Sequence, residues 1–191
     1  MIMGKSATGK DHIYQGIVDN EELALEKLVL YTTRPKREGE ENGREYYFTS
    51  VEHLEELRKS NKIIEERVYD TVMGTWYYFT ADEGQIRTEE EDYITIGTLE
   101  SFVKMREYFG AEVVCPIYIE VDDDIRLMRS IQRESKQKEP NFKELCRRYL
   151  ADEEDFSKKK LAEAGIKKKF DNNGELEKCI SRVEKYIRSN K

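Results

Sequence analysis

The sequence predicts an α/β fold built around a parallel sheet, and three observations lead to this prediction. A glycine-rich pattern typical of phosphate-binding loops, GKSATGKD at 4–11, lies between a short apolar segment and a helical pattern. Further along, the order strand, helix, strand over 92–121 indicates the crossover connection that joins parallel strands. The chain has 191 residues, which is enough for one compact domain with a sizeable core.

The composition is typical of a globular protein with a highly charged surface. Charged residues make up 38% of the chain and hydrophobic residues another 38%, and the apolar residues recur in ordered clusters. The formal net charge is -7, whereas affinity for nucleic acid is supplied largely by clustered Lys and Arg. We therefore expect no nucleic-acid partner and only local binding of phosphate.

The sequence also indicates a cytoplasmic protein without membrane contact. No apolar run approaches the roughly 20 residues needed to cross a bilayer, and no signal segment is recognisable at the start. Cys115, Cys146 and Cys179 are far apart and odd in number, which favours reduced thiols. The segment MIM leaves almost no room for a strand before Gly4, so we expect the first strand to be truncated.

The first half of the chain contains a predicted helix followed by mixed structure. Helical spacing of apolar residues begins directly after the glycine loop and ends at DN, 19–20. KLVLYTT, 27–33, is predicted as one short buried strand. The next segment, 34–48, contains Pro, Gly and Asn-Gly signals, which predict a loop with a turn. A helix at 50–61 and β-rich structure at 63–80, interrupted at Gly74, complete a small α+β insertion over 31–80.

The second half returns to alternating strands and helices. We expect a strand at 92–97, a helix at 98–110 closed by Gly110, and a buried strand at 112–121. An acidic cap, Asp122 to Asp124, begins a helix that is broken at 135–141. One long charged helix is predicted over 142–160, followed by a short strand, a turn and a terminal helix.

The glycine loop has the groups that a phosphate site requires. Glycines let backbone N–H groups approach an anion, a helix N-terminus carries partial positive charge, and a lysine can follow the β and γ phosphates. Gly4, Gly9 and Lys10 supply these features, although a flexible N-terminal turn would also fit a short pattern. Asp11 stands where the pattern has a hydroxyl residue; its carboxylate suits Mg²⁺, directly or through water, but also repels phosphate.

A second group of residues, in YTTRPKREGEENGREYYF, forms a possible anion site. Arg34 and Arg37 are three residues apart and are followed by Gly39, Glu40, Gly43 and Tyr46. Arginine presents a planar fork that binds phosphate through paired hydrogen bonds. The whole string resembles the T-T-R-x-P-R-x-G-E-x-x-G-x-x-Y signature of guanylate kinases. The resemblance continues through IIEE, MGT, LMRSIQRE, CRRYLADEEDF and FDNNGELEKC, almost end to end.

This resemblance implies a P-loop NTPase-type three-layer core with a parallel sheet, a small monophosphate-binding insertion and a helical lid. The corresponding ranges are 1–30, 81–125 and 151–191 for the core, 31–80 for the insertion and 126–150 for the lid. It also implies transfer of the γ-phosphoryl of ATP to GMP or dGMP with Mg²⁺ as cofactor. The partners would then be these small molecules, with the protein as a monomer or homodimer.

The family's functional residues carry over onto matching positions. The resemblance assigns ATP binding to the loop and its first helical turn: Gly4, Lys5, Ser6, Ala7, Thr8, Gly9, Lys10, Asp11 and His12. It assigns GMP binding to Arg34, Arg37, Tyr46, Glu65 and Thr75, where Glu65 would accept hydrogen bonds from guanine. It assigns catalysis to Lys10, Arg34, Arg37, Arg129, Arg133 and Arg148, with Arg147 as the alternative to Arg148, and metal binding to Asp11.

The sequence departs from the family pattern mainly on the guanine side. Leu30 replaces a serine, Met73 replaces a tyrosine, and Thr95 and Gly97 replace acidic residues. A lost hydrogen bond to a base costs on the order of 1 to 3 kcal/mol. Two alternatives therefore stay open: a kinase with an altered acceptor, or a non-catalytic module that binds a nucleotide or phosphopeptide. The retained glycine loop favours an enzyme.

Overall fold

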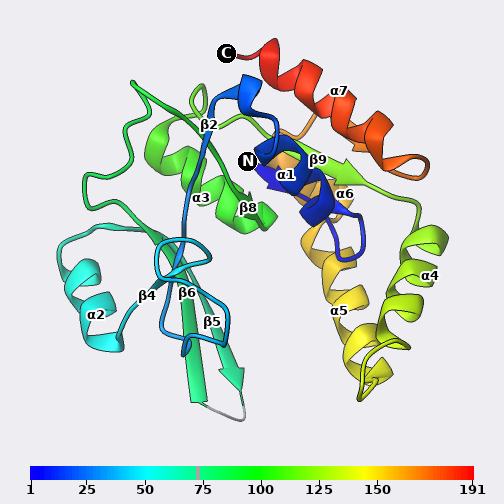
Figure 1. Cartoon of the computed structure of the whole chain (residues 1–191), viewed down its shortest axis with the longest axis horizontal. Helices are drawn as coiled ribbons and strands as arrows, with labels where there is room; N and C mark the ends of the chain where they lie inside the picture. The colour runs from blue at the N-terminus through cyan, green and yellow to red at the C-terminus, as the bar shows by residue number, and fades with distance from the viewer. Residues whose placement is uncertain (72–73) are drawn as a thin grey trace.

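The computed structural model describes residues 1–71 and 74–191. It has a layered α/β core from which an insertion and a pair of helices project (Figure 1). Met73, which replaces a tyrosine of the family pattern, lies outside the described residues.

The core is a parallel sheet, which confirms the predicted fold class. Its strands lie in the order β10 (Lys169–Asp171), β9 (Ile117–Glu120), β1 (Ile2–Met3) and β8 (Ile96–Gly97), and all neighbours are parallel. The chain enters β8 directly from β7 (Asp92–Ile94), which pairs in parallel with β2 (Leu25–Lys27). The central strand β1 therefore has partners on both sides although it contains only 2 residues.

Helices cover both faces of this sheet and produce three layers. On one face α1 (Lys10–Val18) and α7 (Leu176–Arg188) bury a cluster that includes Ile2 and Ile119. On the other face α3 (Leu99–Phe109) and α6 (Lys158–Glu163) bury a cluster that includes Met3 and Tyr118. Adjacent strand residues thus enter opposite clusters, as the alternation of side chains along a strand requires.

The insertion is a separate small sheet with its own core. Its strands are β4 (Tyr47–Phe48), β3 (Tyr31–Thr32), β6 (Gly74–Ala81) and β5 (Ile63–Thr71) in spatial order, and α2 (Val51–Lys59) packs against them. Tyr31, Leu54, Leu57 and Phe79 form most of the buried cluster. The long β5–β6 pair is antiparallel and extends away from the core (Figure 1).

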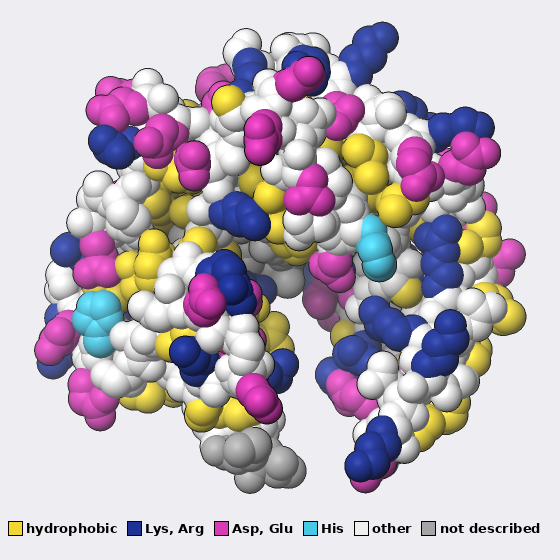
Figure 2. All heavy atoms as spheres, in the orientation of Figure 1, with side chains coloured by type: hydrophobic (Ala, Val, Ile, Leu, Met, Phe, Trp, Pro, Cys, Tyr) yellow, Lys and Arg dark blue, Asp and Glu magenta, His cyan; other side chains and the backbone are white. Residues whose placement is uncertain are grey.

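Two further helices, α4 (Asp123–Glu134) and α5 (Phe142–Asp155), lie side by side on the opposite side of the molecule from the insertion (Figure 1). Figure 2 shows an open cleft between these helices and the insertion. The lid is predicted to span 126–150. Position 126 lies within α4 and position 150 within α5, so neither limit coincides with the end of a helix.

Several predicted elements are wrong in their extent, among them the strand at 112–121, of which only Ile117–Glu120 forms β9. KLVLYTT is not one strand: β2 ends at Lys27 and β3 begins at Tyr31, because Leu28 packs into the core cluster while Tyr31 packs into the insertion. The helix predicted over 142–160 is divided, because Phe156 turns inward to stack on Tyr118 at 5.7 Å and Ser157 caps a new helix, α6.

The acidic cap at 122–124 lies at the start of α4, but the Asp122 side chain makes no capping hydrogen bond. Cys115, Cys146 and Cys179 are free thiols. Within 1–71 and 74–191, no helix combines the length and the apolar character that crossing a membrane requires.

We predict that Met105→Ala lowers the free energy of unfolding by about 2 to 5 kcal/mol, because truncating a buried side chain removes apolar contacts and leaves a cavity. Met105 lies on α3 and is only 5% exposed. The matched control is Met128→Ala on α4, where the side chain is 55% exposed and we expect a change within about 0.5 kcal/mol. Urea unfolding of both variants measures the difference, and equal losses would contradict the assignment of Met105 to the core.

Candidate active site

The candidate site begins where the parallel strands end. The phosphate loop follows β1, Thr98 follows β8, Asp122 follows β9 after one residue, and Asn172 follows β10. Since the strands are parallel, these segments meet at one edge of the sheet. Crevices at this edge are the usual ligand sites of open α/β sheets.

Two glycines allow the phosphate loop to lie against its neighbours. A Cβ on Gly4 would come within 2.6 Å of the Ile119 carbonyl oxygen, so only glycine fits beside β9. Gly9 has φ of 81°, and a Cβ there would lie 2.6 Å from the Asn172 amide nitrogen. That amide donates to the Thr8 carbonyl at 2.8 Å. The loop therefore packs closely against the end of β9 and is hydrogen-bonded to the residue that follows β10.

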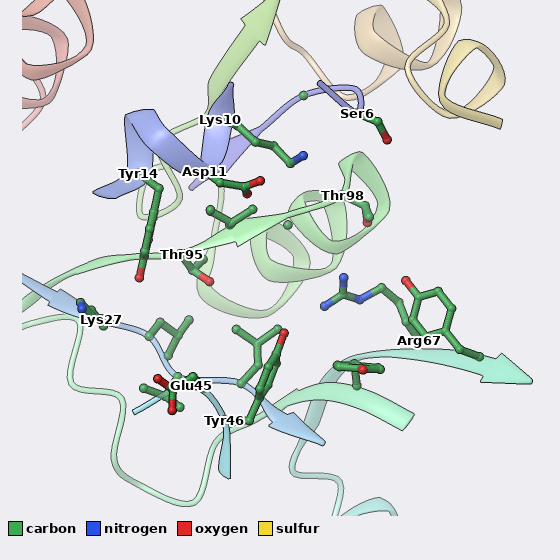
Figure 3. A pocket seen from close by; sticks show the side chains of 18 of the residues that line it. Ser6, Lys10, Asp11, Tyr14, Lys27, Glu45, Tyr46, Arg67, Thr95 and Thr98 are labelled. Atoms are coloured by element: carbon green, nitrogen blue, oxygen red, sulfur yellow. The ribbon is translucent and has the colours of Figure 1, made fainter. Parts of the chain in front are cut away.

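A cavity of about 770 Å³ extends from this loop to the insertion (Figure 3). Gly4, Ser6, Lys10 and Asp11 line it on the loop side. Tyr46, Arg67, Trp76 and Tyr78 line it on the insertion side. Trp76 thus belongs both to the insertion and to the wall of this cavity.

A second cavity, of about 360 Å³, lies on the other side of the loop. Its walls include His12, Arg129 and Arg133, and Lys10 and Asp11 line both cavities. Arg129 donates to the Asn172 carbonyl at 3.0 Å. The fold thus brings two predicted arginines of α4 to the glycine loop, across about 120 residues of sequence.

Arg148 lies farther out on α5. It shares a cavity with Arg133, and its guanidinium is 3.7 Å from the carboxylates of both Glu134 and Glu144. Arg147 pairs with Glu144 at 2.7 Å and its side chain is 65% exposed. Neither residue lines the two cavities beside the phosphate loop.

The arginine pair of the insertion is held by a carboxylate. Arg34 is buried and donates to both Glu40 oxygens, at 2.9 and 2.7 Å, while its guanidinium lies 5.4 Å from the Tyr46 ring centre. The Arg34 side chain and the Arg37 backbone N–H together lower the pKa of Glu40 to about 2. Arg37 is exposed, and only Tyr46 of these three predicted GMP ligands lines the large cavity.

The two residues predicted to contact guanine have other partners. Glu65 is buried and accepts hydrogen bonds from Thr80 and Ser101, both at 2.9 Å. Thr75 is exposed and donates to Asp70 at 2.8 Å. Neither is among the described residues that line the large cavity. Of the substituted positions, Leu30, Thr95 and Gly97 do line this cavity.

A group of charged residues that sequence analysis did not select joins the lid helices to the phosphate loop. Arg126 is fully buried and pairs with Asp123, Asp152 and Glu153. Its guanidinium also lies 3.9 Å from the centre of the Tyr149 ring. The signal in the sequence was the spacing of Arg126 from Asp123, one helical turn apart, but a buried role cannot be read from spacing alone.

Two carboxylates of this group accept hydrogen bonds from residues of the phosphate loop. Asp152 accepts a hydrogen bond from the Ser6 backbone N–H at 2.8 Å, and both Glu153 oxygens accept from Lys5 Nζ at 2.7 Å. Lys5 also lies 3.6 Å from Asp123. An N–H group that could bind phosphate therefore binds a protein carboxylate, and the predicted ATP ligands Lys5 and Ser6 are tied to α5.

The described residues contain no cluster of three or more His, Cys, Asp or Glu that could hold a metal ion by itself. Asp11 is a single exposed carboxylate that points toward the large cavity below Lys10 (Figure 3). Mg²⁺ commonly takes one or two protein carboxylates and completes its shell with water and substrate phosphates. The donor set present fits such a shared site.

Known proteins that resemble this chain agree in family. The family model described as guanylate kinase matches residues 1–190. A guanylate kinase of Porphyromonas gingivalis is 30% identical over 112 residues, which are 58% of this chain and 58% of that protein. A guanylate kinase of Bacillus subtilis is 34% identical over 77 residues, which are 40% of this chain and 36% of that protein. The aligned parts thus span less than two thirds of these relatives.

A solved structure has the same fold. The guanylate kinase of Anaplasma phagocytophilum superposes with a TM-score of 0.60 at 20% sequence identity, over 99% of this chain and 84% of that one. The parallel sheet, the glycine loop at its edge and the adjoining cavities define a P-loop protein of the α/β class. Within that class, the chain belongs to the guanylate kinase family.

We predict that Arg126→Met lowers the free energy of unfolding by roughly 3 kcal/mol, because carboxylates beside the loop would lose their buried partner. Water screens part of this interaction, because the Asp123 and Glu153 side chains are 61% and 36% exposed. The control is Arg147→Met, which removes an exposed pair on α5 and should cost less than about 1 kcal/mol. If the two variants unfold at the same denaturant concentration, Arg126 does not hold this group together.

Proposed function

We propose that the protein transfers the γ-phosphoryl group of ATP to GMP or dGMP. The observation that carries this proposal is that Lys10 and Asp11 line both cavities. A donor bound toward the α4 arginines and an acceptor bound toward the insertion would then meet at one lysine. Phosphoryl transfer depends on such alignment and on charge neutralisation, with little covalent chemistry by the protein.

Each group of residues would have a separate task in this reaction. The amides of the glycine loop and Lys10 would hold the ATP phosphates, and Arg129 and Arg133 would neutralise charge that develops during transfer. Tyr46, Arg34 and Arg37 would bind the acceptor phosphate after rearrangement of the Glu40 contacts. Arg148 would approach as α4 and α5 close over the loop, which would also exclude water.

Mg²⁺ fits this proposal as a shared ligand of Asp11 and the ATP phosphates. When bound, it would neutralise phosphate charge and keep the terminal phosphates in a fixed orientation. The chain itself contributes the single Asp11 carboxylate and the position of Lys10 beside it.

We also propose a cytoplasmic protein that acts as a monomer or homodimer. The three free thiols support the location, since cysteines of secreted proteins are usually paired.

ADP formation from ATP and Mg²⁺ with GMP, dGMP, AMP, UMP and CMP in parallel tests the proposal. We expect the fastest turnover with a guanine nucleotide, and Lys10→Ala should reduce it by at least about a hundredfold, because a charge on the transferred phosphate loses its partner. Lys185→Ala on the exposed face of α7 is the control and should retain full activity.

Other outcomes of this assay separate the remaining alternatives. Fastest turnover with another monophosphate would identify an altered acceptor. Measurable nucleotide binding without turnover on any acceptor would instead indicate a binding module and refute the kinase proposal.

We predict that Asp11→Ser raises the Mg²⁺ concentration for half-maximal activity by about tenfold, because a hydroxyl is a weaker ligand than a carboxylate. Asp19→Ser, at the C-terminal end of the same helix, is the matched control and should leave the Mg²⁺ dependence unchanged. Faster turnover at an unchanged Mg²⁺ requirement would show that Asp11 acts only by repelling phosphate.

A further inference from the structure

Three hydrogen bonds and one charge pair engage the Glu65 carboxylate. Its Oε1 accepts from the Thr80 hydroxyl at 2.9 Å and from Arg67 Nη2 at 3.4 Å. Its Oε2 accepts from the Ser101 hydroxyl at 2.9 Å and lies 3.2 Å from Arg67 Nε. A carboxylate has about four lone-pair sites. Two hydroxyl groups and one guanidinium therefore satisfy this side chain.

Arg67 lies between this carboxylate and the large cavity. It comes from β5, and its guanidinium points into the cavity (Figure 3). The Arg67 side chain is 21% exposed and lines the cavity wall, whereas the Glu65 side chain is 4% exposed and does not. The Nε group is buried and has no aligned hydrogen bond, so the contact at Oε2 is a charge pair. A ligand in the cavity thus meets the arginine and not the glutamate.

Apart from Asp11, the carboxylates elsewhere on the cavity wall already have partners: Glu45 accepts from Arg44 and from the Glu41 N–H, Asp152 accepts from the Ser6 N–H, and Asp155 lies 3.6 Å from Lys160. The three substituted positions add no carboxylate. Leu30 has no polar atom in its side chain, Gly97 has no side chain, and Thr95 offers only a hydroxyl. The N1–H and 2-amino groups of guanine are hydrogen-bond donors and need acceptors. Carbonyl oxygens on a base need donors, which the guanidinium of Arg67 supplies.

We propose that Arg67 is a specificity-determining residue that occupies Glu65 and makes the acceptor site nearly indifferent to the 2-amino group of a purine. The ligand class is then 6-oxopurine nucleoside monophosphates, with or without this amino group. This inference rests on the proposed acceptor site in the large cavity and deepens it.

The test compares the dissociation constants of GMP and IMP, which differ only by the 2-amino group, using titration calorimetry. The wild-type protein should bind the two within about threefold, because Arg67 keeps Glu65 from both of them. Arg67→Met introduces an apolar side chain of similar length and removes the hydrogen-bond donors and the positive charge. In this variant we expect the preference for GMP to increase by about tenfold to a hundredfold, since the amino group can reach Glu65.

Two control variants test whether the change in GMP preference depends on the pair of Arg67 and Glu65. Adding Glu65→Gln to Arg67→Met should abolish the gained preference for GMP. The Gln amide has one acceptor oxygen, and its NH₂ group is a donor that cannot accept from the 2-amino group. Arg58→Met removes another arginine that pairs with a β5 glutamate, Glu66, outside the cavity, and should leave the preference unchanged. Arg67→Ala provides a second variant if Arg67→Met does not fold.

The outcomes separate this inference from the proposed function. An unchanged GMP preference in Arg67→Met, or a strong preference already present in the wild-type protein, overturns the inference while the kinase proposal stands. Binding that follows the expected pattern without ADP formation on any acceptor overturns only the kinase proposal. Failure of wild-type protein and variants to bind either nucleotide overturns the acceptor site and the inference with it.

Discussion

The candidate site depends on the close contact between the glycine loop and the ends of two strands. Side chains at Gly4 or Gly9 would collide with the Ile119 carbonyl and the Asn172 amide, each at 2.6 Å. Asn172 in turn donates to the Thr8 carbonyl inside the loop. Because these contacts fix the backbone, the N-terminus of α1 and the side chains of Lys10 and Asp11 are directed to the place where the two cavities meet.

Several cationic side chains around the site are already paired with carboxylates of the protein. Three arginines that could bind anions are already engaged by carboxylates: Arg34 by Glu40, Arg67 by Glu65, and Arg126 by Asp152 and Glu153. Phosphate binding would exchange such internal pairs for pairs with the ligand, and only the difference between the two would contribute to affinity. Asp152 on the Ser6 amide is the clearest case, since a phosphate there must displace a protein carboxylate.

Sequence patterns predicted the parallel sheet, the helices and the insertion, because these depend on local periodicity and on turn residues. They failed at 27–33 and 142–160, where Leu28 and Phe156 turn into the core. The glycine loop was also evident from local spacing. The charge partners were not, because Arg126 meets Asp152 only through the packing of α4 on α5. Likewise, the hydroxyl of Ser101 reaches Glu65 across 36 positions of sequence.

In the proposed reaction, one lysine at the sheet edge serves a donor and an acceptor held on opposite sides of it. A bisubstrate analogue in which five phosphates join adenosine to guanosine tests this claim most directly. We expect the analogue to compete with ATP and with GMP, to bind more tightly than either, and to lose most of its affinity in Lys10→Ala, because a single chain of phosphates would pass Lys10. Competition with only one nucleotide, or unchanged affinity in Lys10→Ala, would contradict it.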